Sequence, residues 1–209
     1  MSSAQNSRKI TNKGSKKVIG TFPSLKMGET VCWESQLELD YIYLLEFDPD
    51  VLSYREQPLQ IFYEHNGKRR RYTPDFLVER PNKSQLIEVK PEEHKTKEKN
   101  VLLFKAVAPI IRQKGYEFLI ATERIIRAQP RLYHIKLLTK YSRTPIRPQH
   151  QVYCYELLSQ NREVSLGEMI QFFANKGEGV QIIYSLLYHG LIAVDLMTPI
   201  GPHSIVRLP

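Results

Sequence analysis

Three residues with ionisable side chains stand near the ends of two neighbouring predicted strands. Asp75 lies in RRYTPDFLVER, and Glu88 and Lys90 lie in QLIEVK. A buried strand is ordinarily apolar, so two carboxylates and an ammonium at one end of a sheet suggest chemistry rather than packing. Residues two apart on a strand share a face, which places Glu88 and Lys90 on the same side of the sheet.

A Pro-Asn-Lys-Ser turn joins these strands and sets their register. If the turn is centred between Asn82 and Lys83, antiparallel pairing places Asp75 opposite Lys90. Directly paired residues point to the same face. We therefore expect Asp75, Glu88 and Lys90 to converge in one patch, which a slip of one residue would disperse.

Two carboxylates that approach each other repel unless a cation lies between them. Mg²⁺ takes oxygen ligands and keeps several waters, so Asp75, Glu88 and the backbone carbonyl of Val89 are candidate ligands. We expect Mn²⁺ to substitute for Mg²⁺. Such an ion polarises a phosphoryl oxygen and activates a water, and the Lys90 ammonium would orient that water or stabilise charge on phosphorus. The pattern predicts hydrolysis of a phosphodiester.

A helix predicted for ESQLELDYIYLLEFD offers a third carboxylate and metal ligand, Glu38. Glu34 and Glu38, four residues apart, should project from one side of this helix. Glu38 follows the core residue Leu37, so it should stand at the rim of the packed face and reach the metal. On its own, however, Asp followed by Glu-x-Lys also fits a surface salt bridge on an exposed sheet.

The predicted elements follow in the order helix, strand, strand, strand, helix, strand. PLQIFYEH, followed by an Asn66-Gly67 turn, precedes the two strands described above. EKNVLLFKAVAPIIRQKG is the second helix, with a kink or division expected at Pro109 and an end at Gly115. YEFLIAT is the last strand. This order predicts an α/β fold, in which three antiparallel strands and a crossover helix build a mixed sheet with helices on its faces.

Three segments are expected along the chain. Residues 1–20 form a flexible basic arm, residues 21–149 the catalytic domain, and residues 150–209 a smaller domain that follows the polar linker YSRTPIRPQHQ. In the smaller domain, Ser165 and Glu168 have capping-box spacing, and EGVQIIYSLLYHG reads as a helix closed by Gly190. LIAVDLMTPIGPHSIVRL reads as a hairpin. Two helices and a hairpin are typical of a winged-helix unit.

The net charge of +8 is unevenly spread. Residues 1–150 hold 27 Lys and Arg against 17 Asp and Glu, whereas residues 151–209 hold 3 against 5. Basic clusters favour a phosphate backbone as partner, although a basic surface also simply keeps a protein in solution. The acidic tail is expected to dock a protein rather than DNA. The predicted DNA-binding residues are Lys68, Arg69, Arg70, Arg71, Arg124, Arg127 and Arg131.

Cysteine usage and hydropathy argue against several classes of protein. Cys32 and Cys154 lie far apart without a partner at ligand spacing, so neither a zinc site nor a disulfide framework is expected. No apolar run reaches the roughly 18 residues of a membrane span. A reducing, cytoplasmic location fits best.

Several blocks taken together resemble a known family. YTPDFLV and IEVKP on this element order resemble the restriction-endonuclease-like PD-(D/E)xK nucleases. More closely, ESQLELDYIYLLEFDPDVLSYREQPLQI, YTPDFLV, IEVKP and GYEFLIATE resemble the TnsA endonuclease subunits of heteromeric cut-and-paste transposases. The resemblance is strongest over about residues 20–125 and extends to the tail, where that family has a winged-helix-like domain.

This resemblance implies roles for particular residues. Glu38 takes the family's helix-borne acidic position, Asp75 that of the metal-binding aspartate and Lys90 that of the catalytic lysine. Glu88 falls where the family can have Gln, so its role as a ligand rests on chemistry instead. Gln57, in another family-like block, is either active-site support or a polar residue at the start of a strand.

The resemblance also implies partners. A TnsA-type protein cuts the 5′ ends of the element in double-stranded DNA, while a DDE transposase, TnsB, cuts and joins the 3′ ends. A AAA+ regulator, TnsC, couples both to target choice. Two other functions stay open from the residues alone: a stand-alone restriction or repair nuclease of the same fold, and a non-catalytic assembly factor that binds DNA and partners.

Overall fold

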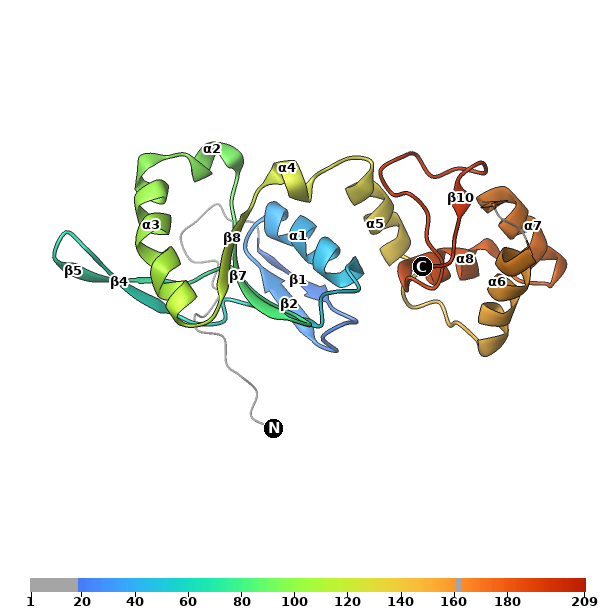
Figure 1. The fold of residues 1–209 in the computed structure, drawn as a ribbon, viewed down its shortest axis with the longest axis horizontal. Helices are drawn as coiled ribbons and strands as arrows, with labels where there is room; N and C mark the ends of the chain where they lie inside the picture. Colours follow the sequence, from blue (N-terminus) through green and yellow to red (C-terminus); the bar gives the residue numbers. More distant parts are fainter. Residues whose placement is uncertain (1–18, 161–162) are drawn as a thin grey trace. The chain divides into compact units, whose positions relative to one another are not determined.

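The structure is a computed structural model that describes residues 19–160 and 163–209. The chain forms two compact units, Met1–Arg127 and Ala128–Pro209 (Figure 1). The predicted arm of residues 1–20 falls almost wholly outside the described residues. The division after Arg127 comes earlier than the boundary predicted near residue 150, so the stretch YSRTPIRPQHQ lies inside the second unit.

The first unit combines a sheet, two separate hairpins and four helices among its described residues. Its elements are β1 (Gly20–Pro23), β2 (Thr30–Trp33), α1 (Gln36–Phe47), β3 (Ser53–Glu56), β4 (Ile61–His65), β5 (Lys68–Tyr72), β6 (Phe76–Arg80), β7 (Lys83–Val89), α2 (Glu92–Lys95), α3 (Glu98–Gln113), β8 (Glu117–Ala121) and α4 (Glu123–Ile126).

The central sheet has the strand order β3-β6-β7-β8. β6 is antiparallel to both β3 and β7, whereas β7 and β8 are parallel. Parallel neighbours need a crossover connection, which α2 and α3 provide here. The mixed sheet and its helices form a restriction-endonuclease-like core, so the predicted fold class is confirmed.

Two of the predicted strands differ from the structure. RRYTPDFLVER is divided at Thr73-Pro74-Asp75 into β5 and β6, because Pro74 has no N–H to continue a ladder. β4 pairs with β5 in a hairpin separate from the main sheet. The first strand of the sheet is instead β3, which the sequence analysis missed. The hairpin turn at Asn66-Gly67 is confirmed, with φ of 52° and 66°.

Helix α1 ends where the sequence predicts and begins two residues later than predicted, at Gln36. The Ser35 hydroxyl caps its start by accepting the N–H of Glu38 at 3.1 Å. Its end comes at Phe47, where the N–H of Asp48 donates to the carbonyl of Leu44 at 3.0 Å and Pro49 follows. The cap fixes the first turn of α1, and with it the backbone of Glu38.

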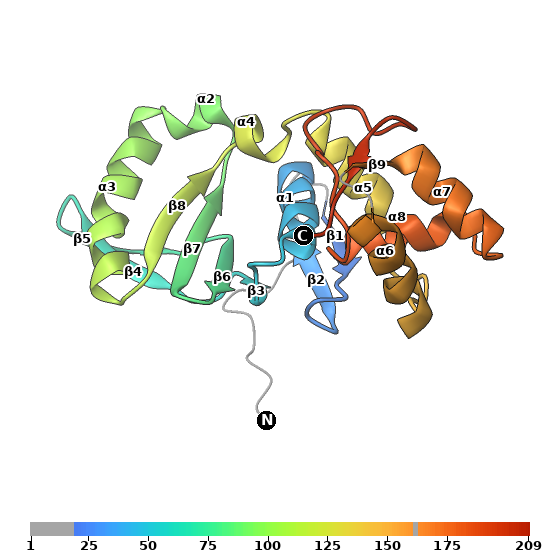
Figure 2. The same cartoon turned by 45° about the vertical axis from the view of Figure 1, so that its right-hand side comes forward.

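Alternating side chains of β6 supply the core on both faces of the sheet. The ring of Phe76 is buried 5.7 Å from that of Tyr41 in α1. Leu77 packs on the other face with Val107 and Ile111 of α3. Helices α1 and α3 therefore cover opposite faces of the sheet (Figure 2). Polar residues from one end of the sheet line a cleft together with residues of both helices.

Helix α3 runs through Pro109 from Glu98 to Gln113, so the predicted division is wrong. Proline leaves one carbonyl of the helix without its usual donor. Burial of Val107 and Ile111 on either side of Pro109 offsets that loss, because both side chains are fully enclosed. Gly115, with φ of 85°, follows the helix end as predicted.

The second unit contains α5 (Arg131–Thr139), α6 (Pro148–Gln160), β9 (Val164–Ser165), α7 (Leu166–Asn175), α8 (Val180–Tyr188) and β10 (Ile205–Val206). Its boundary lies before α5 because α5 packs on α8. The capping box of Ser165 and Glu168 begins α7, as predicted. The segment predicted as a hairpin closes through an antiparallel bridge between Ala193 and Arg207, and its strand β10 pairs in addition with β9.

None of the helices in the described residues has the length and apolar character needed to cross a membrane.

Candidate active site

The turn between β6 and β7 sets a register that differs from the predicted one. Arg80 pairs with Lys83 and Phe76 with Ile87. Continuing this register by one residue brings Asp75 beside Glu88 rather than Lys90, so the predicted pairing is wrong by two residues. An even shift preserves the face, because side chains alternate with a period of two. Asp75, Glu88 and Lys90 therefore still converge on one face of the sheet, and they line one cleft.

Glu88 is buried and held by two donors. The hydroxyl of Tyr72 donates to Glu88 Oε2 at 2.6 Å, and the Lys90 ammonium donates to Oε1 and forms an ion pair. Lys90 Nζ also lies 5.8 Å from the centre of the Phe104 ring. Burial, together with the Glu88 carboxylate, raises the pKa of Tyr72 well above its ordinary value. Tyr72 therefore stays a neutral donor to Glu88.

Asp75 is partly buried, and its Oδ2 accepts the N–H of Val89 at 2.7 Å. Burial raises the pKa of Asp75 well above its ordinary value, and the carboxylates of Glu88 and Glu38 raise it further. The Val89 amide and the Lys90 ammonium oppose that rise. Three acidic groups are thus close enough to repel, which is the situation that a bound cation relieves.

Glu38 closes the start of its own helix. Its Oε1 accepts the Ser35 hydroxyl at 2.9 Å, and its Oε2 accepts the N–H of Glu34 at 2.7 Å. Because Glu34 precedes the cap residue Ser35, the prediction that Glu34 and Glu38 project from one side of a helix is wrong. Both side chains nevertheless line the same cleft as Asp75.

Gln57 joins the acidic residues through both its backbone and its side chain. Its N–H donates to the carbonyl of Asp75 at 2.8 Å, and its Nε2 donates to Glu34 at 2.9 Å. Its φ is 43°, a left-handed conformation that costs a non-glycine residue about 1 kcal/mol. These contacts hold Gln57 in that conformation and favour active-site support over a simple strand-start role.

These residues surround a cleft of about 1330 Å³. It is bounded by the start of α1, the junction of β5 and β6, the end of β7 and the segment from α2 into α3. The lining includes all six residues predicted for chemistry or its support: Glu38, Gln57, Asp75, Glu88, Val89 and Lys90.

The donor chemistry of the cleft fits a hard divalent ion. Asp75 and Glu88 offer carboxylate oxygens, and the carboxylates of Glu88 and Glu38 add to the effect of burial in raising the pKa of Asp75. In the part of the chain that the structure describes, no three His, Cys, Asp or Glu side chains are arranged around one point to hold a metal. The reason is local, since Glu88 turns to Tyr72 and Lys90 while Glu38 turns to its helix start.

A comparison of the sequence with known protein families matches the part of the chain that carries Asp75, Glu88 and Lys90. Residues 48–123 match the family model described as TnsA-like endonuclease N terminal. The chain carries a TnsA-like endonuclease domain. No curated protein matches the chain. The matched residues include Asp75, Glu88 and Lys90 and leave Glu38 outside. The domain supports a nuclease connected with transposition.

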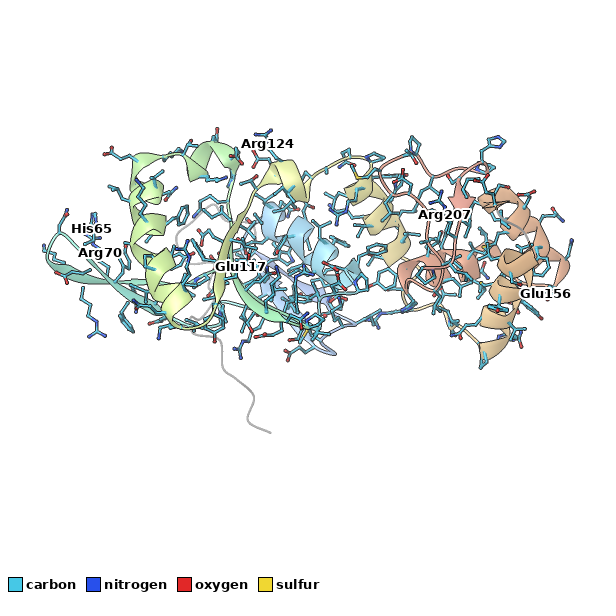
Figure 3. The ribbon with its side chains drawn as sticks, viewed as in Figure 1. His65, Arg70, Glu117, Arg124, Glu156 and Arg207 are labelled. Carbon is cyan, nitrogen blue, oxygen red and sulfur yellow. The ribbon has the colours of Figure 1, made fainter. Side chains whose placement is uncertain are left out.

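The basic residues predicted to bind DNA are placed differently from one another. Lys68, Arg69, Arg70 and Arg71 form the exposed strand β5 of the TnsA-like domain, where Figure 3 labels Arg70 on the hairpin. Arg69 lies over the Phe62 ring at 4.4 Å.

The remaining predicted DNA-binding residues come after β8, the last strand of the central sheet, in the sequence. Arg124 is exposed on α4 (Figure 3). Arg127 donates to Asp40 of α1 at 2.6 Å, so it also fastens α4 to the first unit. Arg131 belongs to the second unit, outside the TnsA-like domain.

The earlier boundary changes the charge of the second unit. Residues 128–209 hold eight Lys and Arg against five Asp and Glu, whereas the expected tail of residues 151–209 is net negative. The basic residues gained include Arg131, Lys136 and Lys140 of α5 and its end. The second unit is therefore net positive, and its net charge gives no reason to exclude DNA binding. The prediction that this part of the chain docks a protein rather than DNA was based on a negative net charge.

Sequence analysis missed Tyr72, which bonds to Glu88 in the TnsA-like domain. Its position immediately before Thr-Pro-Asp was the available signal, because it ends a strand beside Asp75, the predicted metal ligand. It also missed Lys97 and Lys99, which line the cleft from the start of α3.

Proposed function

We propose that this protein is a Mg²⁺-dependent DNA endonuclease that cuts the 5′ ends of a transposon. It would work with a DDE transposase subunit of the TnsB type and a AAA+ regulator of the TnsC type. The observation that carries the proposal is the meeting of Asp75, Glu88 and Lys90 in one cleft of a TnsA-like domain.

Asp75 and Glu88 would hold the metal, with the Val89 carbonyl and Glu38 as further oxygen donors in the same cleft. When bound, Mg²⁺ or Mn²⁺ supplies a Lewis acid for the phosphoryl oxygen and lowers the pKa of a water ligand. Glu38 would contribute after turning away from Ser35, because both its oxygens now bond at the helix start.

The chain's own groups position this chemistry. The Val89 N–H holds Asp75, and the Tyr72 hydroxyl holds Glu88, so both carboxylates are oriented by fixed donors. The Lys90 ammonium stands at Glu88 with 25% of its side chain exposed, which leaves it accessible to a phosphate in the cleft. It would stabilise negative charge that develops on the phosphoryl group.

The second unit would dock a protein partner, the AAA+ regulator. Its order of helix, strand, helix, helix and strand from α6 to β10 supports the winged-helix proposal. Val152 and Tyr155 on α6 are 62% and 66% exposed, which supports a protein contact on this unit. The same proposal places the protein in the cytoplasm, where DNA is accessible. The free thiols of Cys32 and Cys154 fit such a reducing compartment.

A cleavage assay on end-labelled transposon-end duplex, with and without the transposase subunit, tests this function. With Mg²⁺ and the transposase we expect a cut at the 5′ end, and none in the presence of EDTA. Asp75→Ala should remove the cut while the exposed Asp50→Ala control keeps it. Cleavage that is indifferent to both EDTA and Asp75→Ala would refute the proposal.

A further inference from the structure

Basic side chains border the acidic cleft on two sides. Arg71 ends the exposed part of β5, and Lys97 and Lys99 begin α3, and all three line the cleft. All three are exposed. Among the described residues no carboxylate forms an ion pair with any of them, whereas the neighbouring Lys95 pairs with Glu92 at 3.5 Å.

Both borders are anchored by buried neighbours. Tyr72, next to Arg71, is bonded to Glu88 and packs in the core beneath α3. Asn100, next to Lys99, is buried and its side-chain amide donates to the carbonyl of His94 at 2.6 Å. The three cations are therefore carried by backbone that is fixed relative to the carboxylates.

The charges in the cleft explain why such a border is required. Glu34, Glu38, Asp75 and Glu88 all line it, so its interior repels an anionic strand. Exposed cations that lack a carboxylate partner are available to phosphates, and each would replace counterions of the DNA backbone.

We propose that Arg71, Lys97 and Lys99 form a phosphate clamp for the DNA strand to be cut. The clamp binds backbone phosphates on both sides of the scissile bond and holds that bond over Asp75 and Glu88. It rests on the proposed function of the cleft. It gives Arg71, which the sequence predicted to bind DNA, a place beside the scissile bond, and it adds Lys97 and Lys99, which the sequence pattern did not indicate. The tip of the hairpin, including Lys68, lies outside the cleft lining and outside the clamp.

Salt titrations of duplex DNA binding with charge-matched variants test the clamp. Lys97→Gln/Lys99→Gln removes two cleft charges. The control, Lys105→Gln/Lys114→Gln, removes two exposed charges from the same helix and its cap that do not line the cleft. All variants are made in full-length Asp75→Ala protein so that cleavage does not disturb binding, and unfolding midpoints verify folding.

Removal of one cation that binds a phosphate makes the plot of log K against log salt shallower by about 0.9. We expect the Lys97→Gln/Lys99→Gln variant to have a slope shallower by roughly one to two units than that of the parent protein. Arg71→Gln, a second variant on another element, should make the slope shallower by about one. The control pair should change it little. Equal slopes for the cleft and control pairs, or no DNA binding by the parent protein, would overturn the clamp.

Cleavage by the Asp75-containing protein distinguishes failure of the clamp from failure of the proposed function. Asp75-dependent cleavage with unchanged slopes refutes the clamp alone. Reduced slopes with no Asp75-dependent cleavage support the clamp as a DNA site and refute the nuclease.

Discussion

An acidic side chain lies near each end of helix α1, the buried Glu46 near its end and the partly buried Asp75 beside its start, and the two have opposite surroundings. Near its end, Glu46 accepts the hydroxyls of Ser24 and Tyr54 at one oxygen. Its other oxygen accepts the N–H groups of Leu25 and Lys26 at 3.2 and 3.3 Å. Four donors from two segments thus satisfy one carboxylate, which fastens the β1–β2 loop and β3 to α1.

At the start of α1, the described residues give Asp75 one donor, the Val89 N–H, and two acidic neighbours, Glu88 and Glu38. This arrangement destabilises the fold without a cation, as expected of functional groups that the surrounding structure holds in place. A buried carboxylate whose oxygens accept several hydrogen bonds, such as Glu46, is typical of a structural role. A carboxylate crowded by other acids in an open cleft, such as Asp75, is typical of a role in metal binding or catalysis.

The largest contrast between the two ends is expected in cleavage. Asp75→Ala should lower the cleavage rate by at least about a thousandfold, since it removes the least satisfied of the proposed metal ligands. Glu46→Ala, measured at a temperature where it is folded, should keep the rate within a few-fold. The reverse ranking in single-turnover assays with the assembled partners would contradict the distinction.

Lys90→Ala should follow, with a loss on the order of 10²–10³ in rate, typical of one preorganised electrostatic group. Lys83→Ala is the matched control, because Lys83 lies at the other end of β7 and pairs with Glu117 on the surface. Rates are compared at saturating Mg²⁺, so that a change in metal affinity does not enter. A loss within a few-fold would make Lys90 only the ion-pair partner of Glu88.

Stability should rank the two ends in the opposite order. Glu46→Ala leaves buried hydroxyls without their acceptor and should lower the free energy of unfolding by about 3 kcal/mol. Urea unfolding measures the change, with the exposed Glu64→Ala as control. A change below about 1 kcal/mol would show that Glu46 does not fasten the β1–β2 loop.

The smallest effect concerns pH and metal-free stability. A carboxyl whose pKa is raised on folding binds its proton more tightly in the folded state, so stability from this group is lost as pH rises through the folded pKa. Asp75→Asn removes that loss. In EDTA its unfolding midpoint should exceed that of the wild type at pH 8, and the difference should shrink at acidic pH. A midpoint below the wild type at pH 8 would contradict the crowding of charge.

The sequence was sufficient to predict which side chains line the cleft, because the alternation of side chains along a strand survives an even shift of register. The register of Asp75 was off by two residues, yet the face was right, and Glu38 was found through the helix that Ser35 caps. Element types were predicted well where caps and turns are explicit, as at Asn66-Gly67 and Gly115.

Other features depended on tertiary packing that local patterns do not encode. The short strand β3 is defined by its pairing with β6, so Ser53–Glu56 carried too weak a pattern to predict it. Assignment of α5 to the second unit depends on its packing on α8, which also changed the charge assigned to that unit. Lys97 and Lys99 became relevant only when the crossover placed the start of α3 beside the cleft.

Mg²⁺ binding by the full chain, read from thermal unfolding at pH 8, decides whether the crowded acids form a metal site, and it needs no partner. A ligand that binds the folded state alone raises its stability as concentration exceeds the dissociation constant. We predict that Mg²⁺ raises the wild-type midpoint and leaves that of Asp75→Asn nearly unchanged, with Asp50→Asn responding like the wild type. Equal shifts in all three proteins, or none in the wild type, would contradict a metal centre at Asp75 and Glu88.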